Sequence, residues 1–279
     1  MTLENKIKIE TELLTYNGED KIISSYEMKE IIAKQPVTDT WVLKSSIPAL
    51  DNLIVGFYPA EVTVISGVTG QGKTLLSQTM TQHFFLTGNN CLWFSYEVRA
   101  ARFLNKFGIP MPEFYLPLKL RGQDMKWLKN RIYEAKLKYN IKAVFIDHLH
   151  YLLNLTTGHN VSLTIGDIMR QIFNIAHDLE IHIFLLSHMA KTKTEEPMLG
   201  DCRDSGMTEQ EADNVFYVWR DLIRDNCGFI KIVKNREHGV FNKVIPIVKH
   251  GNYFVEDIYA ADTVRNGKGH SKQDSRFKD

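Results

Sequence analysis

The sequence of 279 residues contains few cysteines, no long apolar run and almost no net charge. Its cysteines, Cys91, Cys202 and Cys227, are odd in number and far apart, which excludes a disulfide framework and a metal site built on paired cysteines. No apolar run reaches the ~18 residues that a membrane span needs, and residues 1–10 lack the apolar core of a signal peptide. We therefore expect a protein of the reducing cytoplasm with no membrane partner.

A formal net charge of +1 gives no overall attraction to nucleic acid, so any such site has to be built locally. With 44% hydrophobic and 24% charged residues, the composition is typical of a globular protein, and the length fits one large α/β domain with appendages. We expect an N-terminal arm over residues 1–40, a core domain over residues 41–260, and a disordered basic tail over residues 261–279.

The arm carries two local signals. Residues 6–16 alternate weakly between polar and apolar types, and Asn17-Gly18 is typical of a hairpin turn. Ser24 and Glu27 together predict the capped start of a short helix that continues through Ile32.

The core domain shows short apolar runs separated by helix-length segments, which predicts a mostly parallel, twisted sheet with helices on both faces. Residues 161–179 have apolar side chains at helical spacing and predict one crossover helix. The four runs of the parallel sheet are residues 61–66, 91–95, 143–147 and 183–188. Four later runs at short spacing, residues 215–219, 229–234, 244–248 and 253–257, predict an antiparallel extension near the C-terminus.

The first of these runs leads into a complete phosphate-binding loop of the form G-x-x-x-x-G-K-[ST]. Its glycines let backbone N–H groups point at phosphates, and the following helix adds its positive end. We expect Lys73 to reach the terminal phosphates and the Thr74 hydroxyl to bind Mg²⁺, so that ATP and Mg²⁺ are the cofactors. The loop consists of Gly67, Val68, Thr69, Gly70, Gln71, Gly72, Lys73 and Thr74.

Three polar residues stand at or just after strand ends, at the edge where open α/β sheets bind ligands. Asp147 is predicted to hold Mg²⁺, Glu97 to accept the proton of the attacking water, and His188 to sense the terminal phosphate. The alternatives are a turn-capping aspartate, a glutamate in the first turn of a helix, and a half-buried histidine without a catalytic role. The remaining core histidines show no metal-ligand spacing; these are His148, His150, His177 and His182.

These motifs resemble those of the DnaB-like, ring-forming replicative DNA helicases over about residues 40–257. The resemblance runs through the entry to the loop at residues 45–67, the glutamate segment at residues 91–103 and the acidic strand at residues 143–152. Its most specific part is DCRDSGMTEQEADNVFYVWRD at residues 201–221. The resemblance implies a RecA-like P-loop NTPase core over residues 41–260, which uses ATP to move along single-stranded DNA and to unwind forked duplex DNA.

The turn IVKNREHG resembles the last motif of this family. It implies that Arg236, helped by Lys234, reaches the ATP of a neighbouring subunit in a homo-oligomeric ring, a hexamer in this family. Channel loops at residues 154–160 and 191–206 are implied to face the DNA strand. The resemblance implies that Arg203, Asp204 and Gly206 bind DNA, and the basic residues Lys191 and Lys193 of the same segment are further candidates.

Two departures from the family pattern are visible. His188 stands where most members have glutamine, which indicates a phage or mobile-element origin and hence a bacterial host cytoplasm. We expect no N-terminal helical collar and no zinc-binding primase module, so ring assembly would rest on the core domain and the arm. A primase or a loader is a possible partner under the same resemblance.

Two other functions stay open. A recombination mediator of the same fold would bind DNA as a filament, although the TEQEAD and KNREHG segments argue against it. A regulatory or helicase-loading ATPase would use ATP as an assembly switch without unwinding DNA.

Overall fold

The computed structural model describes residues 3–18, 20–34, 41–153, 161–188 and 206–260. These fall into two compact units, Met1–Thr40 and Trp41–Asp279. The first unit contains helices α1 (Leu3–Leu14) and α2 (Ser25–Lys34).

The α2 helix begins with the predicted cap. The Ser24 backbone N–H donates to Glu27 Oε2 at 2.9 Å, and the Glu27 backbone N–H donates to Ser24 Oγ at 3.1 Å. The weak alternation over residues 6–16 does not mark a hairpin strand, because this segment lies largely in α1. Its lysine and glutamate residues are good helix formers, and Lys6 pairs with Glu10 one turn later.

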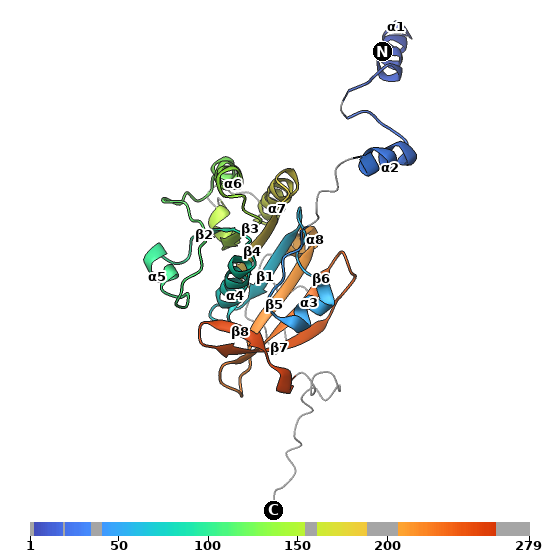
Figure 1. Ribbon diagram of the computed structural model, residues 1–279. Helices are drawn as coiled ribbons and strands as arrows, with labels where there is room; N and C mark the ends of the chain where they lie inside the picture. Colours follow the sequence, from blue (N-terminus) through green and yellow to red (C-terminus); the bar gives the residue numbers. More distant parts are fainter. Residues whose placement is uncertain (1–2, 19, 35–40, 154–160, 189–205, 261–279) are drawn as a thin grey trace, which may run out of the picture. The chain divides into compact units, whose positions relative to one another are not determined.

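The second unit is built on one eight-stranded sheet in the order β2-β3-β4-β1-β5-β6-β7-β8 (Figure 1). The predicted α/β class is confirmed. The strands are β1 (Val62–Gly67), β2 (Cys91–Ser95), β3 (Ala143–Asp147), β4 (His182–His188), β5 (Asn214–Arg220), β6 (Cys227–Asn235), β7 (Lys243–His250) and β8 (Tyr253–Glu256).

Strands β2, β3, β4, β1 and β5 are parallel, whereas β6, β7 and β8 continue the sheet in antiparallel fashion. The predicted antiparallel extension is therefore confirmed for three runs and wrong for the first, which forms β5 parallel to β1. The chain between β4 and β5 is long enough to run from the carboxyl end of one strand back to the amino end of the next. Such a crossover connection produces parallel strands.

Helices cover both faces of the sheet, as predicted. Apolar side chains of α6 and α7 pack on one face with Val64 of β1, and those of α3, α4 and α5 pack on the other with Ile65. The predicted helix 161–179 is α7. The helices of this unit are α3 (Pro48–Ile54), α4 (Lys73–Leu86), α5 (Ala100–Leu104), α6 (Met125–Tyr139), the 3-10 helix η1 (Leu149–Leu152), α7 (Val161–Asp178) and α8 (Gly206–Glu211).

Two expectations from composition concern cysteines and membranes. Cys91 and Cys227 are free thiols. Within the described ranges, every helix is too short or too polar to cross a bilayer.

Candidate functional site

The predicted phosphate-binding loop connects β1 directly to α4, and the helix begins at Lys73 as expected. Gly72 caps α4 with a φ of 107°, and a Cβ atom there would lie 2.9 Å from the Phe254 ring. A Cβ on Gly67 would lie 2.4 Å from the Val218 carbonyl oxygen. Both positions therefore need glycine, for conformation at Gly72 and for close backbone approach at Gly67.

Lys73 is buried beside its own loop and only 5% exposed. Its ammonium group donates to the carbonyl oxygens of Gly67 at 2.8 Å and Val68 at 3.2 Å. It also lies 3.3 Å from His188 Nδ1. The charge is thus held over the loop that would receive the phosphates.

Asp147 ends β3 next to the start of α4. The Thr74 hydroxyl donates to Asp147 Oδ2 at 3.1 Å, while Oδ1 is buried and has no hydrogen-bond partner among the described residues. Burial and then the negative charge of Glu97 raise the pKa of Asp147 to about 6, which the Thr74 hydrogen bond partly offsets. A hydroxyl and a carboxylate oxygen in contact, with a second buried oxygen unsatisfied, fit Mg²⁺.

Glu97 follows β2 in the loop before α5. Because α5 begins at Ala100 with Arg99 at its N-cap, the alternative that Glu97 belongs to a helix first turn is wrong. Its side chain is 35% exposed and borders the same pocket as Thr74, and its Oε2 lies 3.8 Å from His148 Nδ1. The carboxylate is therefore accessible to water and close to the loop.

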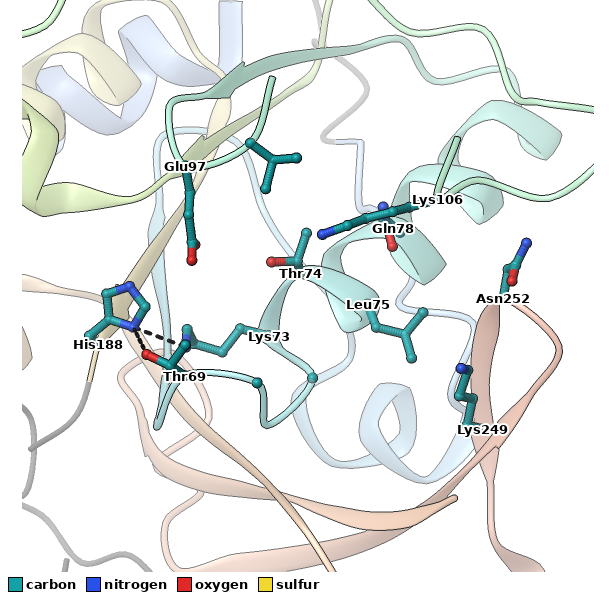
Figure 2. Close-up of a pocket in the computed structure, with 13 residues that line it drawn as sticks. Thr69, Lys73, Thr74, Leu75, Gln78, Glu97, Lys106, His188, Lys249 and Asn252 are labelled. Carbon is teal, nitrogen blue, oxygen red and sulfur yellow. Dashed lines mark hydrogen bonds between the residues drawn. The ribbon is translucent and has the colours of Figure 1, made fainter. Parts of the chain in front are cut away.

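His188 ends β4, the strand that pairs with β1. Its Nδ1 lies 3.4 Å from the Thr69 hydroxyl in addition to its contact with Lys73, so the ring faces the phosphate-binding loop (Figure 2). His148 packs against it with ring centroids 4.2 Å apart. Burial, followed by the charges of His188, His150 and Lys73, lowers the pKa of His148 to about 3, so this imidazole is neutral at pH 7.

The loop, Glu97 and His188 line one pocket with a volume of about 430 Å³ (Figure 2). The pocket also includes residues that the sequence did not single out: Leu75, Gln78, Val98, Lys106, Lys249 and Asn252. Gln78 stands one turn beyond Thr74 on α4, a spacing that could have suggested it. Lys249 and Asn252 come from the β7–β8 hairpin, and no local pattern marks them.

Arg236 and Lys234 lie near the amino ends of the parallel strands, whereas the phosphate-binding loop lies at their carboxyl ends. Asn235 is in register with Asn214, which is in register with Thr63 near the start of β1. At about 3.3 Å per residue, the length of β1 separates this edge from Gly67 by roughly 13 Å along the strand. Arg236 is therefore not brought together with Lys73 of its own chain.

Both basic residues have partners within the chain. Arg236 Nη1 donates to Asp213 Oδ1 at 2.8 Å, and its side chain is 52% exposed. Lys234 Nζ donates to the carbonyl oxygens of Glu209 and Gln210 at 3.0 and 2.7 Å. These carbonyls end α8, so Lys234 caps the C-terminus of that helix.

The predicted DNA contacts fall mostly outside the described residues. Lys191, Lys193, Arg203 and Asp204 lie there, together with the loop at residues 154–160. Gly206 is the first residue of α8.

Comparison with known families gives two matches. The family model for the DnaB-like helicase C terminal domain matches residues 118–254, and the model for the KaiC family of ATPases matches residues 43–110. The first match begins after the phosphate-binding loop and includes Asp147, α8 and the turn with Arg236.

Related sequences include replicative helicases. A probable plasmid replicative DNA helicase of Chlamydia trachomatis is 36% identical over an alignment of 123 residues that covers 42% of this chain and 27% of the relative. The replicative DNA helicase DnaB of Rickettsia felis is 24% identical over an alignment of 216 residues that covers 62% of this chain and 44% of the relative. The chain thus matches less than half the length of these relatives.

Solved structures share the fold. One of them, an isolated ATPase domain, superposes with a TM-score of 0.70 at 18% identity, covering 83% of this chain and 96% of that one. A DnaB-like replicative helicase, described with its interactions with primase, superposes with a TM-score of 0.69 at 17% identity, covering 91% of this chain and 70% of that one. The chain thus has the fold of these ATPase domains, and it is similar to the DnaB-like helicase C terminal domain over residues 118–254 and to the KaiC family of ATPases over residues 43–110.

Proposed function

We propose that this chain is the ATP-hydrolysing motor of a replicative DNA helicase that works as a ring of identical subunits, a hexamer in the simplest case. The observation that carries the proposal is the separation of Lys73 and Arg236 to opposite edges of one sheet. Each subunit therefore presents a nucleotide pocket at the carboxyl ends of the parallel strands and a cation, Arg236, near their amino ends. Such subunits complete their sites only when they stand next to each other.

The pocket residues suit the hydrolysis of ATP. Lys73 lies where its charge can stabilise the phosphoryl group being transferred, and the loop supplies backbone N–H donors. Thr74 and Asp147 would hold Mg²⁺, which when bound neutralises phosphate charge. Glu97 would accept the proton of the attacking water, and His188, in contact with both Lys73 and Thr69, would respond to the terminal phosphate.

Glu97→Gln is expected to lower the turnover rate by at least ~10²-fold, because the amide cannot accept the water proton. ATP affinity should stay close to wild type, since Glu97 would act on the water and not on the nucleotide. Turnover with Mg-ATP and binding of a fluorescent ATP analogue measure the two effects separately. Loss of binding together with turnover would make Glu97 a structural residue.

Single-stranded DNA is the proposed track, contacted by residues 191–206 and by residues 154–160. Arg203→Ala is expected to weaken DNA binding and DNA-stimulated hydrolysis, while hydrolysis without DNA stays nearly constant. Because a phosphate contact releases counterions, the variant should also reduce the salt slope of log Kd by about one contact, ~0.7 on single strands. An unchanged affinity across the salt series would remove Arg203 from the proposed DNA site.

Unwinding of a forked duplex is the test of the whole proposal. Wild-type chain with Mg-ATP should separate a labelled fork that carries a single-stranded tail, and the non-hydrolysable ATP analogue should not support it. The blunt duplex of the same sequence is the matched control, because it offers no strand for a ring to enclose.

The match of residues 43–110 to the KaiC family favours a second candidate, a RecA-like ATPase that assembles with nucleotide but does not unwind DNA. That candidate predicts ATP-dependent assembly and hydrolysis with no strand separation. A fork that stays intact while DNA-independent hydrolysis proceeds would support it.

A further inference from the structure

Three residues with metal-ligating side chains meet at the carboxyl edge of the sheet. Strands β2, β3 and β4 are consecutive neighbours, with Ser95 in register with Asp147 and Asp147 with Leu186. Glu97, His148 and His188 each follow these aligned positions by one or two residues. One ligand atom of each therefore lies within 4.8 Å of the other two.

His148 has the properties of a metal ligand. Its Nδ1 is buried, has no hydrogen-bond partner among the described residues, and lies 3.8 Å from Glu97 Oε2. His148 thus presents a buried ring nitrogen toward the Glu97 carboxylate.

His188 completes the set from the other side. Its ring stands edge-on to His148 at an interplanar angle of 77°. The contact of its Nδ1 with the Thr69 hydroxyl fixes the ring orientation, as outer-sphere partners do for histidine ligands. Figure 2 shows the Glu97 and His188 side chains facing the loop from neighbouring positions on the pocket wall.

We propose that Glu97, His148 and His188 form a binding site for one Zn²⁺ ion, with a fourth position open to water or a phosphate oxygen. Two imidazoles and a carboxylate are a ligand set of zinc sites, whereas Mg²⁺ prefers oxygen ligands in an octahedron. Bonds of about 2.0–2.2 Å in a tetrahedron place ligand atoms roughly 3.4 Å apart. The observed separations of 3.8 Å and up to 4.8 Å close to that value by small side-chain movements.

The site goes beyond the proposed function, and its occupancy does not depend on it. The effect of Zn²⁺ on hydrolysis does rest on the proposed function. Zn²⁺ bound to Glu97 occupies the lone pairs that would accept the water proton, so zinc inhibits hydrolysis. The Lys73 ammonium, 3.3 Å from His188, opposes a cation here and limits the affinity.

The direct test is metal binding by the full chain. The protein is freed of metal with a chelator and titrated with Co²⁺, whose visible absorption is intense in tetrahedral sites and weak in octahedral ones. One Co²⁺ per chain with intense bands is expected, and Zn²⁺ should abolish them by displacement. His148→Ala and His188→Ala should each remove the bands and weaken Zn²⁺ binding by at least ~10-fold, in the range known for disturbed metal sites.

The matched control is His177→Ala, an exposed histidine on α7. It should retain both the bands and the Zn²⁺ affinity. Thermal unfolding of each variant checks folding, and two independent ligand variants keep the test valid if one of them is unstable. Intense bands that survive in both His148→Ala and His188→Ala, or weak octahedral absorption in the wild type, would overturn the proposal.

Hydrolysis provides a separate readout. Zn²⁺ added to excess Mg-ATP should inhibit the wild type, and His148→Ala should need at least ~10-fold more Zn²⁺ for the same fractional inhibition, as for a disturbed metal site. A chain that shows the Co²⁺ bands but never hydrolyses ATP supports the metal site and overturns the proposed function. A chain that hydrolyses ATP and lacks the bands supports the proposed function and overturns the metal site.

Discussion

Lys73→Ala is expected to nearly abolish ATP hydrolysis, with a loss of ~10²–10³-fold in turnover. The ammonium group stabilises the charge that develops on the phosphoryl group in the transition state more than it stabilises the bound nucleotide, so its loss lowers the rate. The lysine is already held against its loop by the carbonyl oxygens of Gly67 and Val68, so little reorganisation is needed before reaction.

Turnover and nucleotide affinity should be measured together for this variant. The fall in turnover should exceed the fall in affinity, and a thermal unfolding curve checks that the loss of the buried ammonium leaves the fold intact. Lys138→Ala is the control, because this exposed lysine on α6 pairs with a helix neighbour, Glu134, far from the loop in sequence. Turnover of Lys73→Ala at the wild-type rate would remove the hydrolytic function from this pocket.

Arg236→Ala is expected to lower hydrolysis by ~10³–10⁵-fold, the range of an arginine supplied from outside a nucleotide site in GTPase systems. The guanidinium stands at the edge of the sheet opposite the loop, so its proposed target is the nucleotide of the next subunit. Asp213, which accepts one of its N–H groups, would hold it in position while other N–H donors face outward.

Mixing experiments test whether Arg236 acts between subunits. Lys73→Ala and Arg236→Ala, each nearly inactive alone, should together recover part of the hydrolysis, because some junctions then join an intact loop to an intact arginine. The recovered activity should fall on dilution as the assemblies dissociate. Co-assembly without recovery, or normal turnover by Arg236→Ala alone, would contradict a shared site.

A structural effect of Arg236→Ala has to be separated from the catalytic one. Asp213 is buried, but the Arg236 side chain is half exposed, and ion pairs of exposed charges contribute about 0–1 kcal/mol to stability. Asp213 also accepts the Val62 backbone N–H at 2.9 Å, which remains in the variant. Arg236→Lys keeps the charge and loses the forked geometry, so it should retain stability while recovering little activity.

Local sequence determined the elements that depend on local physics. The loop at residues 67–74 needs glycines at set positions, and the strands that are buried on both faces read as continuous apolar runs. The cap of α2 was likewise visible in Ser24 and Glu27. The sequence did not predict helix α1, because a weak two-residue alternation and a helical stripe are hard to distinguish in a short, polar segment.

Tertiary structure alone decided which distant residues share the pocket. Asn252 reaches it because Phe254 of β8 donates its backbone N–H to Thr79 on α4 at 2.9 Å, a contact across 175 positions. His148 joins Glu97 and His188 only through the register of three parallel strands, so spacing along the chain could not reveal the set. The direction of β6, antiparallel to β5, moves Arg236 to the far edge. Sequence thus determined the chemistry that lies within one turn or one strand, whereas strand order and direction, set by packing across the whole sheet, decided which of those groups meet.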